Sequence, residues 1–471
     1  MSRIIFYWAG IRFDSSPLYY FAQYIDIDLL RESLLRSLYY FHAQPPLFNL
    51  FLGIGLKIMS NNPGLFYSIC FKILGFVFVQ VFFQNLKLLG IKKKFAFSIV
   101  LLLIVLPPMV LYENWLFYTF PVMVFMNIAL FGLLLFEKSE KTGYLLLFLG
   151  TVAIIALIRS LFHPIWFLVI AIIIILYYRS QMKKILPLCA ITLIIIISPS
   201  IKNYFLFGEF AQSTWLGMSL AKMTIMEIPE DKRLELYQEN VISDVSLAFP
   251  YSTLDKYDKK YQMPKTNIEV LDRIIKKNSD NANFNNPAYI RISHKYMQDF
   301  LSLLKKKPKI YAKRVLEAFY VYFLPTTDYS FLKQNKNEIS GYENLVDKII
   351  YGQYLSSKSY YEKRTDRIND NLMRALDYMR FHVIVFIIFS FAGAVYIIYL
   401  IYKRKSKFPP GEAFIVFNIF YVTIMGNFLE VGENNRFRFL ILPFMIIAVA
   451  KILEPIKSKI ISKKKETAAI S

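Results

Sequence analysis

Cysteine and histidine are scarce in this chain, which has 2 cysteines and 4 histidines among 471 residues. Both cysteines, Cys70 and Cys189, lie inside apolar runs, so neither a disulfide framework nor a thiolate metal site is expected. So few histidines also disfavour a metal site built from imidazole groups. Charged residues make up only 19% of the sequence, which is low for a soluble protein of this length.

Several catalytic signatures are missing as well. The sequence has no glycine-rich phosphate-binding loop of the nucleotide type, no HExxH and no GxSxG. A reaction carried out by this protein would therefore take its free energy from an already activated substrate or from a gradient. Residues 1–13 lack a long apolar core and a small-residue cleavage site, so no signal peptide is expected there.

Apolar residues, in contrast, make up 56% of the chain and aromatic residues 17%. They gather in runs close to the roughly 20 residues that cross a bilayer. These runs are residues 65–90, 95–111, 115–136, 143–158, 164–178, 185–200, 382–402, 412–429 and 438–453. Residues 4–11 are expected to be the end of a further span, and residues 46–59 to form an interfacial or re-entrant helix. The pattern predicts an all-α polytopic membrane protein with about 9–11 spans.

The net charge is +22, and the lysines and arginines lie largely in short clusters between the apolar runs. This distribution is typical of the positive-inside rule and argues against a nucleic-acid partner. It predicts cytoplasmic loops at 91–94, 137–142, 179–184 and 403–407, together with the C-terminal tail. The segments that then face outward are the loops near 113 and 160, residues 202–380 and residues 430–437. The membrane is expected to be the cytoplasmic membrane of a bacterium.

The organisation expected from these features has three parts. Residues 1–202 form an N-terminal membrane module whose first outer loop is 14–60. Residues 203–380, rich in Lys, Asn, Asp and Tyr, form a mostly helical extracytoplasmic segment, in which 291–304 and 311–323 have helical apolar spacing. Residues 312–324 are aromatic and basic and are expected to lie along the outer membrane surface. Residues 381–471 hold the last spans and a basic cytoplasmic tail.

Polar residues at the outer ends of the spans are the candidates for chemistry, because the bilayer makes them costly. Asp14, Asp26 and His42 lie in the first outer loop, and Glu113 lies beside Trp115 at the next outer junction. A carboxylate here would be a general base toward a hydroxyl group. The alternative is a solvated loop with helix-capping acids and an ordinary interfacial glutamate.

Basic residues recur at the later outer junctions. Two arginines before the last span, Arg436 and Arg438, run against the positive-inside bias and indicate an anionic partner such as phosphate. Pairing with Glu430 or Glu433 is the alternative. The other candidates for substrate or phosphate binding at these junctions are Arg159, His163, Lys202, Asn203, Tyr204 and Glu433.

In these places the sequence resembles bacterial membrane glycosyltransferases of the GT-C superfamily, related to protein O-mannosyltransferases and lipid A aminoarabinose transferases. The resemblance is carried by Asp14 in FDSSPLYYFAQYI, by HAQPPL from His42, by Glu113, by KNYFLFGEF and by ENNRFRFLILP. It is weak over residues 215–380. The first helix is shorter than the family pattern, and Asp14 is not followed by the usual second acid, which leaves Asp14 or Asp26 as the base.

The resemblance implies a GT-C-like helix bundle with outer juxtamembrane helices. It implies transfer of a sugar from a polyprenyl-phosphate carrier to a lipid, glycan or protein acceptor outside the cytoplasm. Asp14 would be the base, and Arg436, Arg438 and Arg159 or Lys202 would hold the phosphate. Glu113 and His42 would shape the pocket or bind a divalent metal. The alternatives are an O-antigen polymerase or ligase and a transporter or flippase of an anionic lipid-linked substrate.

Overall fold

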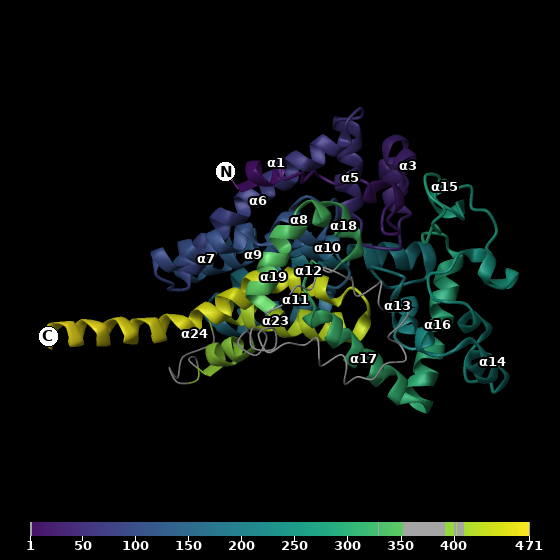
Figure 1. Cartoon of the computed structure of the whole chain (residues 1–471). Helices are drawn as coiled ribbons and strands as arrows, with labels where there is room; N and C mark the ends of the chain where they lie inside the picture. Colours follow the sequence, from purple (N-terminus) through teal and green to yellow (C-terminus); the bar gives the residue numbers. More distant parts are fainter. Residues whose placement is uncertain (1, 328, 352–390, 400–401, 403–408, 471) are drawn as a thin grey trace.

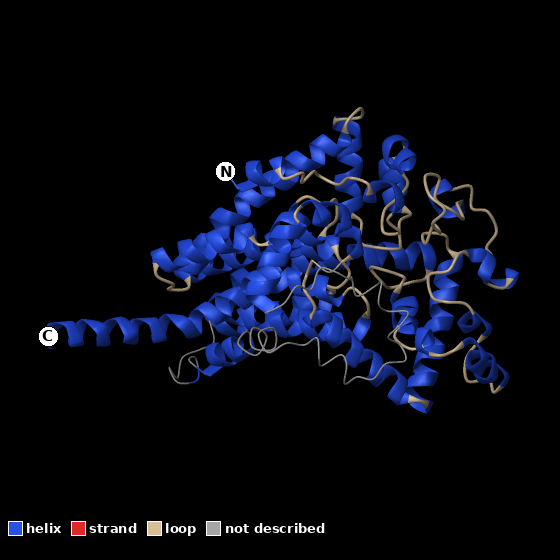
Figure 2. Cartoon of the chain, in the orientation of Figure 1, coloured by secondary structure: helices blue, strands red, loops and turns tan. Residues whose placement is uncertain are grey.

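The structure is a computed structural model of the chain, and it describes residues 2–327, 329–351, 391–399, 402 and 409–470. Side chains are described as far as residue 453. Helices and loops account for all of these residues, with no strand among them (Figure 2). The all-α prediction is confirmed for this part of the chain. Of the predicted span 382–402, residues 391–399 and 402 are helical, and the rest lies outside the described residues.

Four described helices are long and apolar enough to cross a membrane: α6 (Pro63–Leu88), α9 (Thr119–Ser139), α12 (Met182–Phe207) and α23 (Pro410–Leu429). These helices support insertion into a membrane. Three more are apolar but shorter, namely α5 (Leu47–Ile58), α10 (Thr142–Ile158) and α11 (Pro164–Tyr177). The 9–11 full spans expected from apolar runs are therefore not reached among the described residues. Helices α10 and α11 follow the predicted runs 143–158 and 164–178 but have only 17 and 14 residues.

The predicted span over residues 95–111 is not one continuous helix. The run is divided into α7 (Lys93–Val105) and α8 (Pro107–Glu113), whose axes differ by 60°. Leu106 between them has an extended backbone with ψ of 137°. A residue before proline is disfavoured in the helical region, and Pro107 itself suits the first turn of the next helix. Most of α8 is buried, so this break turns Glu113 into the protein.

The loops that the charge pattern places in the cytoplasm contact one another. Glu140 accepts hydrogen bonds from Gln181 Nε2 (2.6 Å) and from Lys184 Nζ through its carbonyl (3.1 Å). Glu137 accepts one from the backbone N–H of Gly411 (2.5 Å). These loops therefore share one end of the helix bundle, as the alternation of basic loops predicts. Which end faces outside the cell stays a prediction.

The other end carries the middle segment. Figure 1 shows α24 (Asn434–Ile470) running out to the C-terminus on one side, with α13 (Leu216–Lys222), α14 (Glu230–Gln238), α15 (Glu269–Asp272) and α16 (Ala288–Lys306) on the opposite side. The first outer loop lies at this end too. Its short helices are α2 (Pro17–Tyr20), α3 (Ile27–Glu32) and α4 (Leu34–Tyr39), which follow α1 (Ser2–Trp8).

The middle segment is not a detached domain. Its helix α17 (Pro308–Phe323) packs against α23 and α24, where the Tyr322 and Thr423 hydroxyls lie 2.8 Å apart. Tyr112 of α8 donates to Thr326 O (2.8 Å). The next two helices are α18 (Lys333–Glu338) and α19 (Ser340–Tyr351). Asn335 of α18 donates to Arg12 O, and α19 packs against α8. Residues 308–351 therefore cover the ends of the membrane helices.

Candidate functional site

Two buried arginines meet at the end of the bundle that carries the middle segment. Arg159 follows α10 in an extended conformation, and Arg436 lies in the first turn of α24. Their exposed fractions are 5% and 4%. The Arg159 guanidinium lies 5.3 Å from the Tyr118 ring and 4.6 Å from the Phe437 ring. Arg436 lies 6.0 and 5.9 Å from the same two rings.

These arginines have more hydrogen-bond donors than acceptors around them. Arg436 Nη2 forms an ion pair with Glu433, which also accepts from the Tyr329 hydroxyl (3.1 Å). Arg436 Nε and Nη1 and Arg159 Nη1 are buried without a partner among the described residues. A buried charged donor without an acceptor is costly. Two cations and one carboxylate thus leave a positive site with free N–H groups.

Aromatic rings form the walls of this site. The Arg436 guanidinium lies 4.7 Å from the Phe117 ring and 5.4 Å from the Tyr329 ring. Trp115 lies against both rings, and its indole N–H is a further buried donor for which the described residues offer no acceptor. We use the name arginine–aromatic cluster for Trp115, Phe117, Tyr118, Arg159, Tyr329, Glu433, Arg436 and Phe437. It is built from the α8–α9 loop, the end of α10, the loop after α17 and the start of α24.

Both arginines and the carboxylate stay ionised at neutral pH. Burial lowers the pKa of Arg159 to about 10, and the positive charge of Arg436 adds to this effect. Burial raises the pKa of Glu433, but Arg436 and Lys222 outweigh it and hold that pKa below its usual value. The cluster therefore keeps a net positive charge, which an anion would neutralise.

Asp14 is fixed beside this cluster through its backbone. Its N–H donates to Asn114 O (2.8 Å), and the N–H of Leu116 donates to Asp14 O (2.9 Å). Asp14 is thus hydrogen-bonded to both neighbours of Trp115. Its half-buried carboxylate accepts from the N–H of Ser16 (2.9 Å) and forms no ion pair among the described residues. Among the three predicted catalytic carboxylates, this one is best placed to take up a proton.

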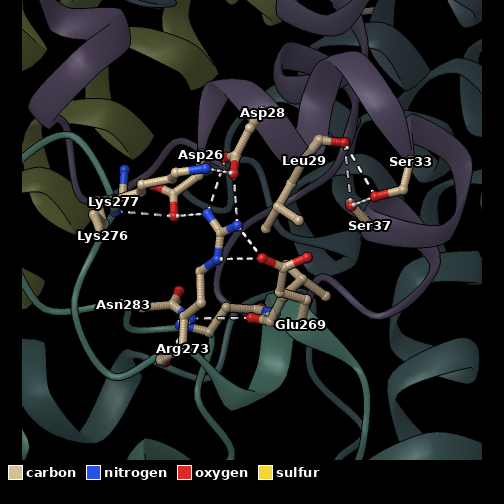
Figure 3. Close-up of polar contacts among 12 residues, drawn as sticks. Asp26, Asp28, Leu29, Ser33, Ser37, Glu269, Arg273, Lys276, Lys277 and Asn283 are labelled. Carbon is tan, nitrogen blue, oxygen red and sulfur yellow. Dashed lines mark hydrogen bonds and ion pairs between the residues drawn. The ribbon is translucent and has the colours of Figure 1, made fainter.

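Asp26 lies instead in a buried ion-pair network that joins the first outer loop to the middle segment (Figure 3). Arg273 Nη1 lies 2.6 Å from Asp26 Oδ2, and Arg273 Nη2 lies 2.6 Å from Asp28 Oδ2. Glu269 pairs with the same guanidinium, and Lys277 Nζ lies 3.1 Å from Asp28. The Arg273 hydrogen bonds hold the pKa of Asp28 far below its usual range. A carboxylate engaged this way is a poor general base.

Replacing Arg273 by glutamine should destabilise the protein by about 3 kcal/mol, because it leaves buried Asp26 without its cation. The thermal unfolding midpoint of the detergent-solubilised protein measures this loss. Lys277→Gln is the matched control, since its exposed ammonium group contributes about 1 kcal/mol or less. Equal midpoints for the two variants would show that the network does not hold the loop.

Glu113 is also neutralised. Its buried carboxylate accepts from Arg3 Nε (2.7 Å) and from Lys72 Nζ (2.9 Å). Lys72 also donates to the side chain of Asn114 (2.8 Å). Glu113 therefore ties α1 and α6 to the start of the loop that carries Trp115, and the geometry gives it a positioning role.

His42 is a fully buried structural group. Nδ1 lies 2.9 Å from the Thr214 hydroxyl and Nε2 lies 2.8 Å from Asn285 O, so Nε2 donates to the carbonyl and Nδ1 accepts. Burial lowers the pKa of His42 to about 3. Both ring nitrogens are occupied, which leaves none for a metal. Among the described residues, no three His, Cys, Asp or Glu side chains approach closely enough to hold a metal ion.

Acidification should destabilise the protein through His42. The unfolded chain binds a proton near pH ~6.5, whereas the folded protein excludes it down to pH about 3, so stability falls as the pH drops through this window. Thermal unfolding midpoints between roughly pH 7 and 4.5 measure the slope. His42→Gln should flatten most of it. His163→Gln should flatten it less, because burial also lowers the pKa of His163, but by a smaller amount. An unaltered slope in His42→Gln would contradict this assignment.

The remaining candidates lie outside the cluster. Lys202 Nζ donates to Phe41 O, and the Asn203 amide donates to Ala211 O (2.7 Å). His163 caps α11, and Tyr204 is exposed. Arg438 donates to Phe323 O (3.2 Å) and Leu324 O (2.7 Å), the carbonyls that end α17. Lys202 and Arg438 thus use part of their donors on backbone carbonyls, and their expected phosphate role stays a prediction.

No known family model, curated protein or solved structure matches this chain. Evidence for the function therefore comes from the residues of the site itself.

Proposed function

We propose that this protein is a membrane glycosyltransferase that moves a sugar from a polyprenyl-phosphate carrier to an acceptor. The arginine–aromatic cluster carries the proposal. Arg159 and Arg436 are buried and together exceed the charge of Glu433. Three of their guanidinium nitrogens have no hydrogen-bond acceptor among the described residues. A phosphate supplies the missing negative charge and acceptor oxygens, and guanidinium groups match its geometry.

The phosphate is both anchor and leaving group in this proposal. As the bond between the anomeric carbon and the phosphate oxygen breaks, its electron pair stays on the phosphate. Positive groups already in place stabilise this charge without reorganisation, which is electrostatic catalysis. The activated sugar–phosphate bond provides the driving force, in agreement with a sequence that has no nucleotide-binding motif.

Asp14 is the proposed general base. The acceptor hydroxyl oxygen bonds to the anomeric carbon, its proton passes to the Asp14 carboxylate, and polyprenyl phosphate departs. The absence of an ion pair at Asp14 among the described residues, and its backbone bonds to both neighbours of Trp115, support this role. Asp26 and Glu113 have structural roles in this proposal, because each carboxylate already forms an ion pair with a neighbouring cation.

Incubation of the purified protein with polyprenyl-phosphate sugars labelled in the sugar tests the proposal. Membrane extract supplies the acceptor. We expect label to appear in a glycan, lipid or protein and to remain on the carrier when the protein is left out. Label that stays on the carrier with every sugar and extract would overturn the proposal.

A further inference from the structure

A second polar site lies on the middle segment, away from the arginine–aromatic cluster. It is a cavity of about 570 Å³ beside α16. The residues that line it include Asp244, Lys260, Tyr261, Arg291, His294 and Lys295. Ser243 and Gln298 complete the lining, and no aliphatic side chain takes part. The volume is in the range of sites for small ligands.

One face of α16 supplies half of this lining. Arg291, His294, Lys295 and Gln298 are spaced three and four residues apart, so they share that face, and all are exposed. The opposite face is tightly packed on α13, where a Cβ atom on Gly217 would lie only 1.8 Å from Ser293 O. The exposed cations therefore stand on a firmly held helix.

The facing wall is also fixed. The buried Asp299 carboxylate accepts from the Ser243 N–H (3.0 Å), from the Ser243 hydroxyl (2.7 Å) and from the Ser246 hydroxyl (2.6 Å). Asp244 lies 2.6 Å from Lys260 Nζ and accepts from the Tyr261 hydroxyl (2.8 Å). These bonds hold the 243–246 turn against α16.

The charges in the cavity do not balance. Lys260 is paired with Asp244, and His294 Nε2 lies 2.9 Å from Glu209. Arg291 and Lys295 have no carboxylate partner among the described residues, and Lys295 donates only to the Gln298 amide oxygen (3.1 Å). Arg291 forms no ion pair among the described residues, and the charge of Lys295 acts also on the Asp299 carboxylate behind the wall. Both cations share the cavity with hydroxyl and amide groups.

We propose that this cavity binds an anionic saccharide through a carboxylate or phosphate group on the sugar. Arg291 and Lys295 contact the anion, and Ser243, Tyr261 and Gln298 are suited to hydrogen-bond the hydroxyl groups. A polar lining without aliphatic residues favours a saccharide over a lipid with its acyl chains. That this saccharide is the acceptor rests on the proposed transferase function, whereas the binding itself does not.

Binding to the purified full-length protein in detergent tests the inference, by calorimetry with tetragalacturonate, glucose 6-phosphate and neutral maltotetraose. We expect at least one anionic probe to bind about tenfold or more tightly than maltotetraose. The double variant Arg291→Gln/Lys295→Gln should lose about tenfold or more of that affinity. Lys305→Gln/Lys306→Gln, which removes two exposed charges from the end of the same helix, should keep wild-type affinity.

Three results would overturn the inference. They are anionic probes that bind no better than maltotetraose, equal losses in the two double variants, and binding of dihexanoyl phosphatidylglycerol in place of the sugars. Failed binding with intact transfer would refute the saccharide site alone, and intact binding without transfer would refute the transferase alone.

Discussion

Replacing Arg436 by glutamine should reduce sugar transfer by roughly 100-fold or more, the size of effect seen when one preorganised donor to a leaving or developing charge is removed. Glutamine keeps much of the volume against Phe117 and Tyr329 but removes the charge. It also removes the guanidinium nitrogens Nε and Nη1, for which the described part of the chain offers no acceptor. Initial rates with a saturating polyprenyl-phosphate sugar measure the effect.

Arg159→Gln should act on the same step, because both guanidinium groups lie against Tyr118 and Phe437. If they hold one phosphate, the double variant should lose less activity than the two single losses multiplied together. Arg179→Gln, an exposed arginine at the other end of the bundle, is the control and should keep the wild-type rate. Normal transfer by folded Arg436→Gln would exclude the cluster as the phosphate site.

Asp14→Asn should lower transfer by about 10²–10⁴-fold, the usual contribution of a general base. The asparagine carbonyl can still accept from the Ser16 N–H, and the backbone bonds to Asn114 and Leu116 do not depend on the side chain. The variant should therefore fold with the wild-type thermal midpoint. Rates and midpoints measured on the same preparations separate a chemical defect from a structural one.

Asp272→Asn is the matched control for Asp14. Its side chain also accepts a backbone hydrogen bond, from Thr266 (2.7 Å), on the exposed part of the middle segment. We expect this variant to transfer sugar at the wild-type rate. Full activity in Asp14→Asn would remove Asp14 as the base.

The membrane helices were largely predictable from the sequence, but the break between α7 and α8 was not. Apolar runs placed most of the described membrane helices, because each buries or inserts a continuous apolar surface. The break at Leu106 was missed although Pro107 signalled it, since the run stays apolar across the turn. Helices α10 and α11, in contrast, keep the bounds of the predicted runs 143–158 and 164–178 to within one residue.

The candidate site was predictable only in part. Arg159, Glu433 and Arg436 stood out because charge at the outer end of a span is costly. In the sequence, Asp26 looked as good a candidate as Asp14, and Arg438 as good as Arg436. Their partners could not be predicted, because Arg273 and the carbonyls that end α17 are distant in the chain. Tyr329 was missed, because nothing in the polar middle segment marks one tyrosine as the neighbour of Glu433.

A double-label experiment in proteoliposomes tests the transferase most directly. The donor carries ³²P in its phosphate and ³H in its sugar, and a membrane glycan fraction is supplied on the side of the bilayer that carries the middle segment. The proposed function predicts that ³H moves to the acceptor while ³²P remains on polyprenyl phosphate, and that Arg436→Gln stops this separation. If both labels cross the bilayer together on an intact donor, the protein is a transporter and the account is contradicted.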